Sequence, residues 1–174
     1  MENKIVEIKY RSYYGKKYIL SRAETEFYEV LKEVIGGKNI IFCKVRMEDL
    51  IGAKDNKYKE ANRNRIKSRH ADFAIFNKET LTIRLVVELD GNSHDNNKSQ
   101  KIDNFKNEAY GSAGIKIARI KQKPYYNREE LAAQIKEAYK KEYKIIYHKN
   151  NDNIDDLFDW IINKIIESIK KLFK

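Results

Sequence analysis

Two acidic residues, Asp72 and Glu88, interrupt segments that are otherwise apolar. Asp72 lies within residues 70–77 and Glu88 near the end of residues 81–89, and both segments have the composition of buried strands. A carboxylate buried in such a strand is costly unless a partner or a metal ion compensates its charge. Only residues 78–80 separate the segments, which predicts a hairpin that places Asp72 opposite Glu88. We therefore expect the two carboxylates to meet at one end of a sheet.

The way in which these two charges are compensated decides what the pair can do. Two uncompensated carboxylates repel each other, and one of them then tends to stay protonated. A divalent cation between Asp72 and Glu88 removes this conflict, and ligands that are all oxygen suit Mg²⁺ or Mn²⁺. A lysine or arginine beside the pair would instead remove the need for a metal ion.

Three further residues are candidates for the same site. Alternation along a strand puts Asp90 on the same face as Glu88. His94 follows in the next loop, and Glu24 can approach from a predicted helix earlier in the chain. Each has a simpler alternative, because Glu24 is suited to capping that helix and a single histidine is more often an ordinary surface or core residue.

The elements that must position these residues follow from capping signals and periodicity. Ser21 and Glu24 form a capping box ahead of an apolar helical pattern, which a Gly-Gly pair ends. Residues 39–46 predict a strand, and residues 47–52 predict a short helical turn. Residues 53–67 predict a basic loop, which is either a solvated surface segment or a segment that contacts phosphates.

The second half of the chain continues the same alternation of elements. The predicted elements are a helix over residues 98–113, a strand over 115–120, a helix over 128–141 with a capping box at Asn127 and Glu130, an edge strand over 143–148, a polar linker over 149–153 and an amphipathic helix over 155–174. This order favours an α/β fold with a mixed central sheet and helices on both faces. It divides the chain into a basic, tyrosine-rich arm (1–20), a main domain (21–148) and a linker with the amphipathic helix (149–174).

Composition restricts the class of protein. The 174 residues include 36 Lys and Arg against 26 Asp and Glu, a net charge of +10. Residues 149–174 hold five basic and five acidic residues, so the excess lies on residues 1–148 and favours a polyanionic partner, although codon bias can also enrich lysine. The single cysteine, Cys43, excludes an internal disulfide and a cysteine-clustered zinc site. No apolar run predicts an integral membrane segment or a signal peptide, so a cytoplasmic location is expected.

Three stretches resemble a known family: residues 21–31 (SRAETEFYEVL), 67–73 (KSRHADF) and 87–95 (VELDGNSHD). They are similar to the restriction-endonuclease-like PD-(D/E)xK superfamily, in the branch related to very-short-patch-repair endonucleases. The likeness is closest to a bacterial domain family of unknown function with an E-x-D-G-x-x-H signature. It spans residues 20–121 and implies a core of order αβββαβ.

The resemblance implies a metal-dependent phosphodiesterase that acts on DNA. It implies that Asp72, Glu88 and the carbonyl of Leu89 hold the metal ion. The commonest members carry a lysine in the place of Asp90, so His94 is the candidate for activating water or protonating the leaving oxygen. Basic residues are expected to contact the nucleic acid, and some to supply the missing positive charge: Lys67, Arg69, Lys98, Lys101 and Arg119.

The sequence therefore predicts a Mg²⁺- or Mn²⁺-dependent DNA endonuclease, with a role in DNA repair, restriction or phage defence. Asp72, Glu88 and His94 are its expected catalytic residues, with Asp90 and Glu24 in support. The alternative is a catalytically inactive module of nuclease fold that binds nucleic acid or a protein partner. The C-terminal amphipathic helix is expected to pack on its own domain or on a second copy in a homodimer. Its alternatives are docking into a protein partner, which would make the chain an interaction protein, and lying on a membrane surface, which its neutral charge and early Asp residues disfavour.

Overall fold

The structure of the chain is a computed structural model, which describes residues 15–91, 97–143 and 165–166, with the backbone alone for residues 97–99. The chain forms two compact units, Met1–Lys141 and Glu142–Lys174. The elements of the first unit are α1 (Arg22–Ile35), β1 (Asn39–Arg46), α2 (Met47–Leu50), α3 (Lys59–Ile66), β2 (His70–Asn77), β3 (Ile83–Asp90), α4 (Asn97–Ser112), β4 (Ile117–Lys121) and α5 (Arg128–Lys140).

The four strands form one mixed sheet in the order β1-β2-β3-β4. The pairs β1–β2 and β2–β3 are antiparallel, whereas β4 runs parallel to β3 after the crossover through α4. One row of paired residues crosses the whole sheet, from Cys43 through Phe73 and Val87 to Ala118. The predicted α/β fold with a mixed sheet is confirmed.

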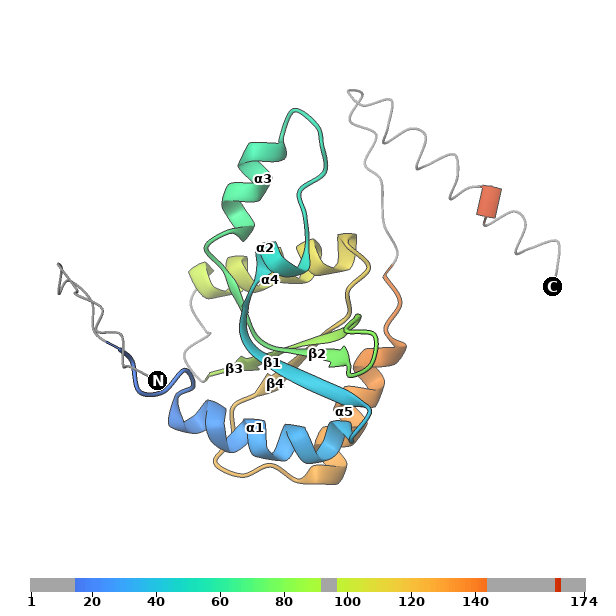
Figure 1. Cartoon of the computed structure of the whole chain (residues 1–174). Coiled ribbons are helices and arrows are strands. Elements are labelled where there is room, and N and C mark those ends of the chain that lie inside the picture. The colour runs from blue at the N-terminus through green and yellow to red at the C-terminus, as the bar shows by residue number, and fades with distance from the viewer. Residues whose placement is uncertain (1–14, 92–96, 144–164, 167–174) are drawn as a thin grey trace, which may run out of the picture. The chain divides into compact units, whose positions relative to one another are not determined.

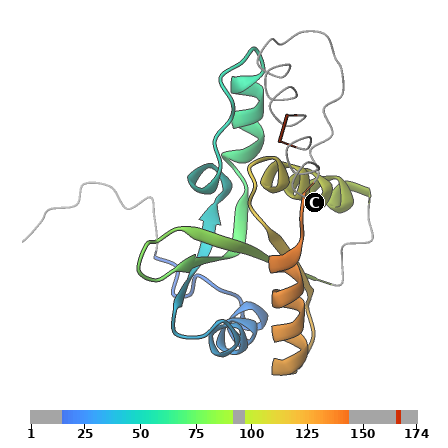
Figure 2. The same ribbon diagram turned by 90° about the vertical axis from the view of Figure 1, so that its right-hand side faces the viewer.

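Helices cover both faces of this sheet. Figure 1 shows α1 and α5 on one side and α2 and α4 on the other, and the turned view in Figure 2 agrees. On the first side, Phe27 of α1 packs against Phe73 and Tyr126, with ring centroids 5.4 and 5.0 Å apart. Because side chains alternate along a strand, Val86 and Glu88 share the face that α4 covers.

Local signals explain where several elements begin and end. The predicted capping box is present in α1, because Ser21 Oγ accepts a hydrogen bond from the Glu24 N–H at 3.3 Å while Glu24 Oε2 accepts one from the Ser21 N–H at 2.8 Å. Gly36 ends the helix with a φ of 71°, a conformation that glycine adopts without a steric cost. The second predicted capping box is only half formed, because Asn127 caps α5 while the carboxylate of Glu130 pairs with Lys123.

The prediction of a loop over residues 53–67 is wrong in its second half, where α3 forms. The sequence of α3, KEANRNRI, buries only Ile66 and has no apolar face, so its periodicity carries no helical signal. The predictions for residues 144–148 and for most of the C-terminal helix concern parts of the chain outside the described residues. Of the helices in the described ranges, none is both long and apolar enough to cross a membrane.

Candidate functional site

A cavity of about 250 Å³ opens where β2 begins and β3 ends. Carboxylates from α1, both strands and α4 converge on it. Its lining consists of Glu24, Asp72, Glu88, Leu89, Asp90, Ile102, Asp103 and Lys106. This concentration of acidic groups lies in a chain with an excess of basic residues, so the site has a charge opposite to that of the molecule around it.

The β2–β3 hairpin brings Asp72 and Glu88 together, as its sequence predicted. Phe73 pairs with Val87, so the residues that flank this pair, Asp72 and Glu88, are cross-strand neighbours. The Leu89 N–H donates a hydrogen bond of 3.0 Å to Asp72 Oδ2. Asp72 is therefore fixed by the backbone of the strand that carries Glu88.

Glu88 is the buried acid of the site, with only 4% of its surface exposed. Its Oε2 accepts a hydrogen bond of 2.6 Å from Lys106 Nζ, whereas its buried Oε1 has no hydrogen-bond partner among the residues that the structure describes. Burial raises the pKa of Glu88 to about 7, the nearby charge of Asp72 adds to the rise, and Lys106 opposes both without cancelling them. Lys106 therefore compensates the charge of Glu88 only in part.

Lys44 of β1 joins two of the other acids. Its Nζ lies 2.5 Å from Glu24 Oε1 and 2.8 Å from Asp72 Oδ1. Burial opposes the charge of Glu24, but the hydrogen bonds from Lys44 and Ser21 and the charge of Lys44 together outweigh it and lower the pKa of that carboxyl group. Glu24 therefore caps α1 with one carboxylate oxygen, as one alternative predicted, and its other oxygen contacts Lys44 at the site, while its catalytic role stays a prediction.

Asp90 is paired with an arginine from the neighbouring strand. Arg119 of β4 lies 2.8 Å from Asp90 Oδ1 and 3.0 Å from Asp103 Oδ1, and it donates a further hydrogen bond of 3.0 Å to Asn107. The parallel pairing of β3 with β4 sets Arg119 beside Glu88 in the register. Arg119 is thus engaged by acids of the site, which fits its predicted role as a source of positive charge beside Asp90, and its predicted contact with nucleic acid stays a prediction.

The structure does not place the remaining predicted site residues in the lining of the cavity. His94 and the side chain of Lys98 lie outside the described part of the chain. Lys67 and Lys101 are exposed and Arg69 is half-buried, and none of the three lines the cavity. Lys44 and Lys106 were not predicted as site residues. Lys44 carries the signal that identified Asp72, because it is a charged residue inside an otherwise apolar strand, residues 39–46.

The structure differs from the expectation that a metal ion alone compensates the two carboxylates. Lysine side chains contact both Asp72 and Glu88. Within the described ranges, no group of three or more His, Cys, Asp and Glu side chains is arranged to hold a metal ion. Among the described residues, the lysines still leave a feature that suits a cation. Glu88 Oε1 is buried there without a partner, in a cavity whose ligands would be oxygen atoms.

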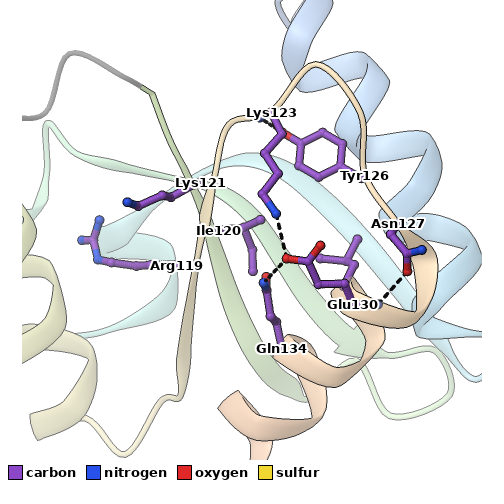
Figure 3. A pocket seen from close by; sticks show the side chains of 9 residues that line it. Arg119, Ile120, Lys121, Lys123, Tyr126, Asn127, Glu130 and Gln134 are labelled. Atoms are coloured by element: carbon purple, nitrogen blue, oxygen red, sulfur yellow. Dashed lines mark hydrogen bonds and ion pairs between the residues drawn. The ribbon is translucent and has the colours of Figure 1, made fainter.

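A second hollow, of about 190 Å³, lies between β4 and the start of α5. Figure 3 shows that Arg119 and Lys121 point away from the cluster around Glu130. In that cluster, Glu130 accepts hydrogen bonds from Lys123 at 2.7 Å and from Gln134 at 3.1 Å. These polar groups pair with one another and fix the start of α5, so we assign the chemistry to the carboxylate cavity.

Comparison with known proteins gives one match. Residues 16–139 match a family described as a protein of unknown function, DUF2726. This range holds the sheet, the helices α1 to α4, all but the last residue of α5, and every residue that lines the carboxylate cavity. No curated protein and no solved structure matches the chain.

Proposed function

The chain belongs to the DUF2726 family, and from its carboxylate cavity we propose that it is a metal-dependent phosphodiesterase that cleaves DNA. The observation that carries the proposal is the convergence of Asp72 and Glu88 on one cavity, where Glu88 Oε1 is buried and, in the part of the chain that is described, unpartnered. A buried carboxylate oxygen without a partner is costly, and a cation bound beside it would remove that cost.

Charge balance around the cavity supports a cation. In the part of the chain described, three basic side chains pair with four acids of the cavity. Lys44 contacts Glu24 and Asp72, Lys106 contacts Glu88, and Arg119 contacts Asp90. Arg119 also pairs with a fifth acid, Asp103. Carboxylates thus outnumber the cations they contact. At neutral pH the imbalance falls on Glu88, whose raised pKa leaves it partly protonated.

In this proposal Asp72, Glu88 and the carbonyl of Leu89 hold Mg²⁺ or Mn²⁺. Such a cation, when bound, supplies a Lewis acid for the phosphate and lowers the pKa of water. Asp72 is held in place by the Leu89 N–H and by Lys44, so it provides a fixed ligand. Lys106 is the nearest positive charge to Glu88, and it is placed to stabilise negative charge that develops on a phosphate in the cavity.

The order α1-β1-β2-β3-α4-β4 supports the same proposal, because it is the αβββαβ order that the resemblance to restriction-endonuclease-like enzymes implies, and α2 and α3 are insertions between β1 and β2. In this reading His94 remains the candidate for proton transfer, a contribution typically of about 10²–10⁴-fold.

Nicking of supercoiled plasmid tests the proposal. With Mg²⁺ or Mn²⁺ we expect nicking that EDTA stops, and we expect Asp72→Asn and Glu88→Gln each to slow it by about 100-fold or more. Glu29→Gln is the matched control, because Glu29 is an exposed carboxylate of α1 that pairs with Lys32 away from the cavity. Equal nicking by all four proteins would show that the site is wrongly assigned.

One observation favours the second candidate, an inactive module that binds nucleic acid. Lys44 and Lys106 already occupy positions from which they compensate Asp72 and Glu88. If this pairing is permanent, the protein will bind DNA with strong salt dependence and will not nick it with either metal ion. Calorimetric titration with Mn²⁺ separates the two candidates without an activity assay. The nuclease must bind Mn²⁺, and Glu88→Gln must weaken that binding, whereas the inactive module does not require Mn²⁺ binding.

A further inference from the structure

Two arginine side chains share one aromatic ring beside the carboxylate cavity. The guanidinium carbon of Arg65, near the end of α3, lies 4.1 Å from the ring centroid of Phe105 in α4. That of Arg69, just before β2, lies 4.8 Å from the same centroid. Arg69 also donates a hydrogen bond to the backbone carbonyl of Arg65, which ties the two residues together. We call this group the arginine pair.

The arginine pair lacks the partners that nearby arginines have. Arg46 pairs with Asp49 at 2.7 Å, and Arg63 of α3 pairs with Glu48 at 2.6 Å. In the described ranges no carboxylate forms an ion pair with Arg65 or Arg69. Two positive charges held on one ring repel each other, so an anion bound between them would be stabilised.

The backbone connects the arginine pair directly to the carboxylate cavity. Arg69 precedes His70, and Phe105 precedes Lys106. Lys106 Nζ donates hydrogen bonds both to the His70 carbonyl, at 2.9 Å, and to Glu88, at 2.6 Å. Arg69 is therefore next in the chain to a residue that Lys106 contacts, and Phe105 is next to Lys106 itself.

We propose that Arg65 and Arg69, stacked on Phe105, form a binding site for the phosphodiester backbone of DNA next to the carboxylate cavity. A guanidinium that stacks on a ring still presents its N–H groups at the edge, in the fork that matches a phosphate. Phe105 orders both forks before the ligand arrives, which lowers the entropic cost of binding. The identity of the ligand rests on the proposed function, since a bound backbone would place a neighbouring phosphate at the acids.

Binding without metal ions tests this site separately from catalysis. The full chain is titrated into fluorescently labelled duplex DNA in EDTA at several salt concentrations. Arg65→Gln and Arg69→Gln are each expected to weaken binding by about tenfold near physiological salt and to lower the slope of log K against log salt by about 0.9. Arg22→Gln removes the same charge from an exposed arginine of α1 and should change neither quantity.

Phe105→Leu is a further test of the stack. It keeps both charges but removes the ring, and we expect weaker binding with a nearly unchanged salt slope. Circular dichroism and thermal unfolding of each variant check that the fold is retained. Salt slopes of the Arg65 and Arg69 variants equal to that of Arg22→Gln would overturn the proposal. The proposal would also be overturned if the Arg65 and Arg69 variants lost binding to anionic lipid vesicles but still bound DNA as the wild type does. Because binding is measured in EDTA, its result does not depend on nicking. A protein that binds DNA through these residues but does not nick plasmid with Mg²⁺ or Mn²⁺ refutes the nuclease and leaves this site standing.

Discussion

Glu88 is the residue in which burial and pairing are least balanced. One of its oxygens contacts Lys106, the other has no partner among the described residues, and its pKa is raised to about 7. The Tyr110 hydroxyl is also buried without a partner in that part of the chain, and the charge of Glu88 adds to the effect of burial in raising its pKa. Unsatisfied buried polar atoms are rare in native proteins, and a bound ligand, ion or water often satisfies them. A ligand that satisfies Glu88 Oε1 would therefore stabilise the folded site.

The raised pKa of Glu88 predicts how stability depends on pH. Between the unfolded value, 4.5, and the folded value, about 7, the folded state holds a proton that the unfolded state releases. Stability from this group is therefore greatest below the unfolded pKa and falls as pH rises, by up to about 3 kcal/mol at 1.36 kcal/mol per unit.

Glu88→Gln removes this titration. We expect the variant to gain stability relative to the wild type as pH rises from 5 to 8, measured by urea unfolding. Glu29→Gln should run parallel to the wild type. A difference between Glu88→Gln and the wild type that stays constant with pH would contradict the raised pKa.

At the scale of elements, β1 is the strand whose backbone departs from regular geometry at the site. Lys44 has a φ of 55°, in the left-handed region that residues with a Cβ rarely adopt. The pairing of β1 with β2 omits it, although its neighbours Cys43 and Val45 pair with Phe73 and Ala71. Strain of this kind persists where the surroundings compensate it. Here the ion pairs of Lys44 with Glu24 and Asp72 are that compensation.

Two substitutions of Lys44 separate the effect of its backbone strain on stability from the effect of its ion pairs. Lys44→Ala and Lys44→Gly both remove the ion pairs, but only glycine relieves the left-handed φ, so the glycine variant should be more stable by about 1 kcal/mol. Leu81, in the β2–β3 turn, has a φ of 54° and lies away from the cavity. The same Ala–Gly difference is expected there. Equal stability of the two Lys44 variants, by chemical denaturation, would show that β1 relaxes once the ion pairs are lost.

Elements also explain which parts of the site the sequence could predict. The sequence predicted Asp72 beside Glu88 because a short turn after residue 77 limits the register of the hairpin. In the structure the connection is longer than predicted, over residues 78–82, and the register shifts between Ile75 and Phe76, but Phe73 still pairs with Val87. Lys106 and Arg119 could not be predicted in the same way, since their positions depend on the crossover through α4 and the parallel pairing of β4. Helix α3 was missed because no apolar period marks it, and with it the contact of Arg65 with Phe105. Local pattern thus predicted the acids, whereas long-range packing determined their basic partners.

At the scale of the molecule, the net positive charge is confined to one part of the chain. The excess of ten positive charges lies on residues 1–148, because residues 149–174 contain five basic and five acidic residues. The compact unit that carries the sheet, Met1–Lys141, falls within this basic part. Binding to a polyanion depends on the number of phosphates neutralised, so the basic part should account for it.

Truncation after His148 tests this division. We expect the shortened chain to bind duplex DNA with the affinity and salt slope of the full chain, because the removed residues carry no net charge. Fluorescence anisotropy in EDTA over several salt concentrations measures both quantities, and sedimentation of the two proteins reports their oligomeric state. A lower affinity with an unchanged oligomeric state would show that the removed tail, residues 149–174, itself contacts DNA. A change from dimer to monomer, with affinity falling in parallel, would instead show that two copies of the basic part bind together through the tail.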